Sequence, residues 1–151
     1  MKLRVVFLAA IVALGAFAAC NSGGSNNTPA SPCTIPASSV SVVYPAPNAT
    51  GVPGAFQQII VAVSSPLPSS WNAVIQYTDP VNALQTRGGN QVVTVSPPFP
   101  TPSATPSFAN PVYQSSAFPS LVVPSNVTVS VFLNDLNSGC TPTSVSSFTT
   151  Q

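Results

Sequence analysis

Charged side chains are almost absent from this 151-residue chain, which has three Lys and Arg, two Asp and Glu, and no histidine. The five charged residues are Lys2, Arg4, Asp79, Arg87 and Asp135. Without histidine or glutamate the chain lacks the usual general acids and bases, and a serine without a base is a poor nucleophile. We therefore predict that it is not an enzyme. The lack of a basic patch likewise argues against binding of nucleic acid.

Metal ligands are equally scarce. The sequence has no histidine or glutamate, and its two aspartates are 56 residues apart, from Asp79 to Asp135. Lone aspartates in loops usually cap turns. The sequence therefore predicts no metal site and no cofactor.

The N-terminal twenty residues have the pattern of an export signal. Lys2 and Arg4 precede an uncharged apolar run from Val5 to Ala19, which small residues close. This run is shorter than the roughly 20 residues of a spanning helix, and a stretch rich in Gly, Ser and Asn follows it. We expect residues 1–19 to be a cleaved signal helix. An uncleaved membrane anchor is the alternative.

The sequence FAAC, Phe17 to Cys20, resembles the lipobox of bacterial lipoproteins, although Phe17 stands where Leu is usual. The resemblance implies that Cys20 becomes the first mature residue and carries covalent lipid. Asn21 at the second position implies sorting to the outer membrane or cell surface. Residues 20–37 then form a flexible linker.

Removal of residues 1–19 leaves Arg87, Asp79 and Asp135 as the charged side chains, so their charges sum to −1. No polybasic segment remains to hold an anionic membrane surface. Attachment to the membrane is therefore expected through the lipid on Cys20, and two or three acyl chains are needed for stable anchoring.

Short β-strands separated by Pro, Gly, Asn and Ser turns fill the rest of the chain. No segment of the mature chain has a helical period of useful length. The pattern predicts a single β-sandwich domain over residues 38–151 with about seven strands. The expected strands are Ser39–Pro45, Gln57–Ser65, Asn72–Asp79, Asn90–Pro97, Pro111–Phe118, Ser125–Asp135 and Ser144–Thr150, and the sequence RGG, Arg87 to Gly89, is expected to be a turn.

The proline-rich segment Ser96–Pro111 interrupts this pattern. Its prolines favour an extended backbone and cannot donate ladder hydrogen bonds. We expect a long loop, which Phe99 and Phe108 pack against the sandwich. The alternatives are a recognition surface or a glycosylated tract.

Four segments together resemble a bacterial immunoglobulin-like (Ig-like) domain: Tyr44–Pro53, Ile59–Leu67, Leu121–Leu136 and Ser147–Thr150. The resemblance implies an Ig-like or fibronectin-III-like sandwich that serves as a spacer or adhesive module on the cell surface, without catalytic residues. Residues 79–118 have no counterpart in this pattern.

If Cys20 carries lipid, Cys33 and Cys140 are the remaining cysteines, and an exported chain can form disulfides. In Ig-like sandwiches the start of the first strand and the loop between the last two strands lie at the same pole. We therefore predict a Cys33–Cys140 disulfide. A pair of free buried thiols is the alternative.

Three aromatic residues are candidates for ligand binding. Trp71 follows a proline-rich turn, and Tyr77 and Tyr113 could join it in a stacking surface for sugar or peptide. We favour the other interpretation, in which Trp71 is the core tryptophan of the sandwich, near the start of its third strand.

These observations predict a non-catalytic, lipid-anchored Ig-like module of the cell envelope with a structural or adhesive role. Its expected partners are the membrane and an envelope protein or glycan. The alternative is a small glycan- or peptide-binding surface lipoprotein that uses Trp71 and the loop 96–111. The pole with Cys33 and Cys140 should face the membrane, and Gln151 should lie at the opposite pole.

Overall fold

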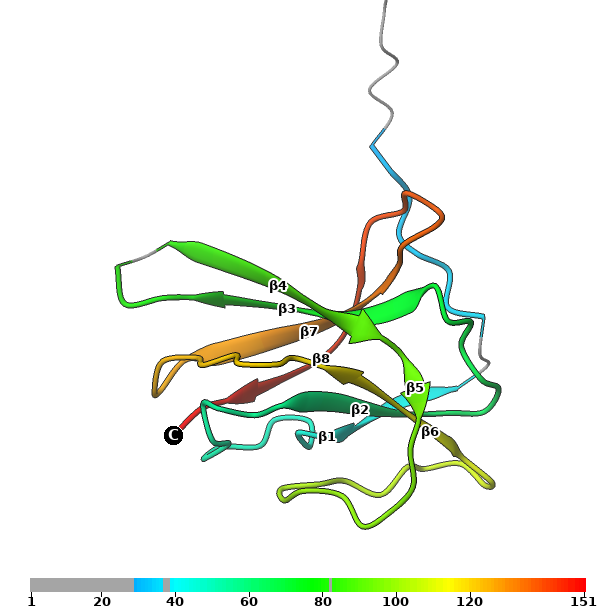
Figure 1. Ribbon diagram of the computed structural model, residues 1–151, viewed down its shortest axis with the longest axis horizontal. Helices are drawn as coiled ribbons and strands as arrows, with labels where there is room; N and C mark the ends of the chain where they lie inside the picture. The colour runs from blue at the N-terminus through cyan, green and yellow to red at the C-terminus, as the bar shows by residue number, and fades with distance from the viewer. Residues whose placement is uncertain (1–28, 37–38, 82) are drawn as a thin grey trace, which may run out of the picture.

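Two four-stranded antiparallel sheets form the described part of the protein, as the computed structural model in Figure 1 shows. The structure describes residues 29–36, 39–81 and 83–151. The predicted signal segment and Cys20 lie outside these residues. One sheet has the order β1-β2-β6-β5, made of Val40–Tyr44, Gln58–Val63, Val112–Ala117 and Val93–Thr94. The other has the order β4-β3-β7-β8, made of Leu84–Gln91, Trp71–Thr78, Thr128–Asp135 and Thr143–Thr149.

This strand order is that of an immunoglobulin-type sandwich. The first sheet corresponds to strands A-B-E-D, and β3-β7-β8 correspond to C-F-G, with β4 added at the edge. The predicted all-β sandwich is thus confirmed. No helix in the described ranges has the length and apolar character that crossing a membrane requires.

The core lies between the sheets and follows the two-residue period of the strands. On β3, Trp71, Ala73, Ile75 and Tyr77 all point inward and are buried. On β7 the alternating apolar residues Val129, Val131 and Leu133 are fully buried. β2, with the sequence QIIVAV, is buried almost along its whole length. On β3 and β7, alternation of inward and outward residues therefore sets which face of the strand meets the other sheet.

The prediction of a turn at Arg87–Gly89 is wrong, because these residues lie inside β4. The hairpin instead turns between Asp79 and Ala83, whose backbone N–H and C=O groups bond at 3.1 Å. Glycine is needed at position 89 because the Phe118 ring packs against it, and a Cβ there would lie 2.8 Å from two carbons of that ring. The expected strand Asn90–Pro97 is correspondingly divided, its first residues ending β4 and Val93–Thr94 forming β5.

Loops cover the outer edges of two strands. The proline-rich loop lies along β1, where Ala104 N–H donates to Val43 C=O at 2.8 Å and Ala46 N–H donates to Pro102 C=O at 3.0 Å. The β1–β2 loop reaches the end of β8, where Asn48 N–H donates to Ser147 C=O at 2.8 Å. Such coverage protects edge strands from pairing with other chains.

Candidate functional site

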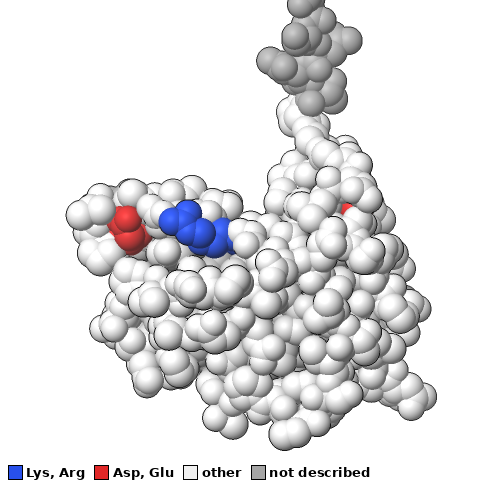
Figure 2. All heavy atoms as spheres, in the orientation of Figure 1, with Lys and Arg blue, Asp and Glu red and all other residues white. Residues whose placement is uncertain are grey.

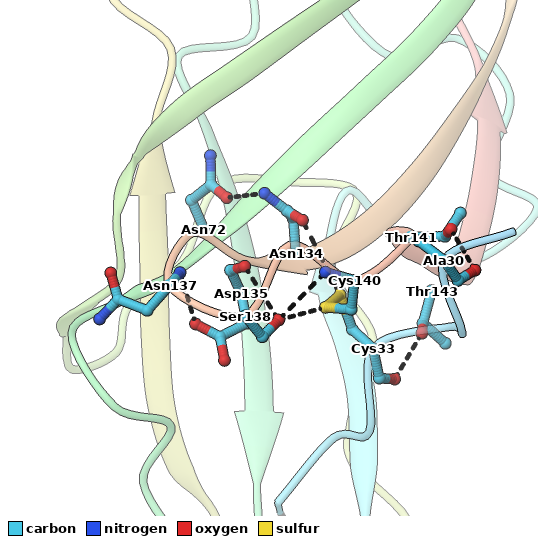
Figure 3. The surroundings of a disulfide bond; sticks show 10 residues. All are labelled: Ala30, Cys33, Asn72, Asn134, Asp135, Asn137, Ser138, Cys140, Thr141 and Thr143. Atoms are coloured by element: carbon cyan, nitrogen blue, oxygen red, sulfur yellow. Dashed lines mark hydrogen bonds between the residues drawn. A yellow bond between two sulfur atoms is a disulfide. The ribbon is translucent and has the colours of Figure 1, made fainter. Parts of the chain in front are cut away.

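A disulfide between Cys33 and Cys140 closes one pole of the sandwich, as predicted (Figure 3). The two Cα atoms are 4.9 Å apart, and 107 positions separate the residues in sequence. Ser138 Oγ lies 2.6 Å from Cys140 Sγ, and Cys140 N–H donates to the same hydroxyl at 3.3 Å. The last loop, between β7 and β8, is thus fixed both covalently and by its own hydrogen bonds.

The segment before Cys33 is also bound to this pole. Pro32 forms a parallel bridge with Thr141, and Cys33 N–H donates to Thr141 C=O at 2.8 Å. Thr141 in turn bonds Ser31 C=O through its N–H at 2.9 Å and Ala30 C=O through its hydroxyl at 2.8 Å. These residues belong to the range predicted as linker, and here they lie against the sandwich. The N-terminal part of the chain therefore reaches the domain at the disulfide pole (Figure 1).

The structure does not bring the three aromatic candidates together. Trp71 is only 2 % exposed and belongs to the core, as the favoured interpretation stated. Tyr77 lies six residues further along β3, and Tyr113 lies on β6 in the other sheet. Trp71 is buried because β3 is an interior strand whose odd-numbered residues face the opposite sheet. No stacking surface of Trp71, Tyr77 and Tyr113 exists in the described structure.

Tyr113 instead holds the proline-rich loop. Its ring lies 4.8 Å from that of Phe99, measured between centroids, and the planes are tilted by 58°. Phe99 and Phe108 both pack against the core, as predicted. The segment 96–111 is therefore attached to the sandwich at both of its phenylalanines.

A cavity of about 440 Å³ lies on the inner side of the β3–β4 hairpin. Tyr77 and Arg87 line it from the hairpin, and the segment that follows β6, residues 118–122, forms its other wall. Arg87 pairs with Ile75 across the two strands, so its side chain belongs to the core-facing side of the sheet. It is nevertheless exposed. The hairpin thus presents a guanidinium and a phenol next to the apolar side chains of Leu121 and Val122.

Hydrogen bonds along the hairpin position Arg87. One guanidinium nitrogen donates to Gln85 Oε1 at 3.1 Å, and Gln85 Nε2 donates to Asp79 Oδ2 at 3.2 Å. Asp79 Oδ1 also accepts from the N–H groups of Val81 and Ala83, both at 3.0 Å, so this aspartate forms the turn, as expected of a loop aspartate. Figure 2 shows the basic atoms beside acidic ones on the projecting hairpin.

Sequence reasoning did not select Arg87 as a site residue. The sequence does show that Arg87 is the only basic residue between residue 5 and the C-terminus, and this could have marked it as a candidate. A lone cation in a nearly uncharged domain contributes little to solubility or to the electrostatic steering of a ligand. The structure adds that Arg87 lies beside a cavity.

The outer edge of β4 carries backbone groups that no other strand pairs, although one of them, Thr86 C=O, accepts from the Arg87 guanidinium at 3.1 Å. Asp79 and Ala83 form a hydrogen-bonded pair, and such pairs alternate along an antiparallel ladder. Leu84, Thr86 and Gly88 are therefore at non-hydrogen-bonded positions, where the N–H and C=O groups point away from β3. Within the described ranges, no segment other than β3 pairs with β4.

Residues that could hold a metal do not gather in the part of the chain that the structure describes. No group of three or more His, Cys, Asp or Glu residues lies close enough there to share an ion. Asp135, the second aspartate, accepts from Asn137 N–H at 3.1 Å and so forms a turn at the disulfide pole (Figure 3).

Comparison of the chain with protein-family models, with curated proteins and with solved structures finds no match.

Proposed function

We propose that this protein is a non-catalytic, lipid-anchored Ig-like module of the cell envelope, tethered at its disulfide pole and serving a structural or adhesive role. The observation that carries the proposal is the path of the chain at that pole. Ala30, Ser31 and Cys33 are all bonded to Thr141, and Cys33 is joined covalently to Cys140. A tether that begins at Cys20 would meet the domain at this point.

The arrangement suits a mechanical role. Force transmitted from Cys20 would enter at Cys33 and pass through the disulfide into the last loop, without peeling β1 away from β2. Gln151 follows β8 and lies at the opposite pole (Figure 1), where its N–H donates to Val52 C=O at 2.9 Å. That pole and the β3–β4 hairpin would then be presented away from the attachment point (Figure 1).

The alternative of a glycan- or peptide-binding site at Trp71 and the loop 96–111 has no supporting observation. Trp71 is 2 % exposed, and Phe99 and Phe108 of the loop are packed on the core. We therefore do not place a ligand at these residues.

Metabolic labelling with an alkyne analogue of palmitate tests the anchoring. The full chain is expressed in a bacterium, and label and membrane association are measured for the wild type and for Cys20→Ser. We expect the wild type to be labelled and membrane-bound and Cys20→Ser to lose the label. The matched control is the double variant Cys33→Ser, Cys140→Ser, which should keep it. An unlabelled wild type, or label retained in Cys20→Ser, would contradict the proposal.

A further inference from the structure

We infer that β4 is a docking strand for an extended segment of a partner protein, and that this segment carries a carboxylate that pairs with Arg87. The inference rests on the adhesive role proposed above and specifies the surface and the chemistry of the partner. It combines the unpaired outer edge of β4 with the cavity that the same strand borders.

The open edge is the first observation. The proline-rich loop covers β1, and β5 has only two residues. The outer edge of β8 is bonded at both ends, since Thr143 Oγ1 donates to Cys33 C=O at 2.7 Å and Thr149 N–H donates to Ala49 C=O at 2.8 Å. β4 is the long edge strand that no described segment covers. A partner strand placed there would gain the main-chain hydrogen bonds by which extended peptides add to sheets.

The chemistry of the inner face is the second observation. A strand added beside β4 would direct alternate side chains toward the face that holds Arg87 and borders the cavity. A guanidinium has five N–H donors, and Arg87 uses two nitrogens, toward Thr86 C=O and Gln85 Oε1. Its remaining donors suit a carboxylate. The exposed Val122, on the far wall of the cavity, suits an apolar side chain two residues away along the same strand.

Neither acidic side chain of this chain is placed to supply the carboxylate. The only acidic side chains are Asp79, which is bonded into the hairpin turn, and Asp135, which forms a turn at the disulfide pole. A second copy pairing through β4 is disfavoured as the occupant, because the strand LQTRGGNQ contains no acidic residue and would bring two Arg87 side chains to the same interface. Charge complementarity therefore favours a different protein with an acidic, extended segment.

The test uses the full chain, purified in mild detergent, and measures fluorescence anisotropy of a labelled peptide. The probe is acetyl-Thr-Val-Thr-Asp-Thr-Val-Thr-amide, which places Val, Asp and Val on one face of a strand. We expect saturable binding that weakens about two- to fivefold when Asn replaces the Asp, as expected for loss of a cross-strand ion pair. A Lys in its place should weaken binding further.

Three protein variants separate the two parts of the inference. Arg87→Glu should reverse the preference, so that the Lys peptide binds more tightly than the Asp peptide. Thr86→Pro removes an outward N–H without removing a bond to β3, and should weaken binding at least about fivefold. The matched control is Thr94→Pro, which removes an outward N–H from the edge strand β5 and should leave binding unchanged. Circular dichroism checks that each variant is folded.

Several outcomes would overturn the inference. These are absence of peptide binding by the folded wild type, equal affinity for the Asp and Lys peptides, and unchanged affinity in Thr86→Pro. Competition by sodium acetate at the peptide's own concentration would indicate a small-carboxylate site without strand pairing. A dimer in sedimentation that Thr86→Pro dissociates would identify a second copy as the occupant. Failure of lipid labelling with intact peptide binding would reject the anchoring alone.

Discussion

Removing the disulfide should strongly destabilise the folded domain. The double variant Cys33→Ser, Cys140→Ser opens a covalent loop whose ends are 107 positions apart in sequence. The chain entropy released in the unfolded state by opening a loop of this size corresponds to about 4.7 kcal/mol. The free energy of unfolding of a domain of this size is about 5–15 kcal/mol in total, so the variant loses a large share of its stability.

Urea denaturation followed by tryptophan fluorescence measures this loss, because Trp71 is the only tryptophan and lies in the core. With a urea dependence of about 2 kcal/mol per molar, the midpoint should fall by about 2 M. The urea midpoints of the single variants Cys33→Ser and Cys140→Ser should each fall by nearly the same amount as that of the double variant, since each substitution breaks the same bond. A fall of less than about 0.5 M, or single losses that add up to the double loss, would refute this reasoning.

Three further perturbations test the packing around the sheets. Gly89→Ala should destabilise the domain by about 1–3 kcal/mol, because the new methyl group would overlap the ring of Phe118. Gln114→Ala should cost about 2–4 kcal/mol in urea denaturation, because the buried amide of Gln114 bonds both the N–H and the C=O of Leu67, at 2.8 and 3.2 Å. Burial raises the pKa of Tyr44 above its ordinary value of 10.0, so the unfolded chain loses this proton first and stability should fall as pH rises above about 10.

Each of these has a matched control. Gly88→Ala should be milder than Gly89→Ala, since the nearest atom to its new methyl group would be the Asn72 amide nitrogen at 3.2 Å, whereas at Gly89 two ring carbons lie at 2.8 Å. Gln58→Ala removes one partly buried bond, at 3.1 Å, and should cost less than Gln114→Ala. Tyr44→Phe should abolish the alkaline decline in the thermal midpoint. A larger loss of stability in Gly88→Ala than in Gly89→Ala, or in Gln58→Ala than in Gln114→Ala, would contradict the stated cause. So would an alkaline decline in Tyr44→Phe equal to that of the wild type.

The strands that sequence predicts well are those whose own residues alternate. Val127, just before β7, and Val129 and Val131 on β7 have a clear two-residue period, and the structure buries 129 and 131 completely. The disulfide could be predicted from two resemblances together: the lipobox accounts for Cys20, and the Ig-like pattern places Cys33 and Cys140 at the same pole.

The parts that sequence does not reveal depend on contacts between distant residues. β4 has the sequence LQTRGGNQ, in which nothing alternates, and its glycines suggest a turn until Phe118 is seen packed against Gly89. The candidate docking strand escaped prediction because an open edge is a property of the whole sheet order.

Intact-mass spectrometry of the mature protein from the membrane fraction tests the central claim most directly. Alkylation before and after reduction reports the N-terminus, the lipid and the thiols in one measurement. The account predicts a chain that begins at Cys20, carries lipid, resists alkylation without reduction, and gains two alkyl groups at Cys33 and Cys140 after it. A mass that retains residues 1–19, lacks lipid, or shows both cysteines alkylated without reduction would contradict it.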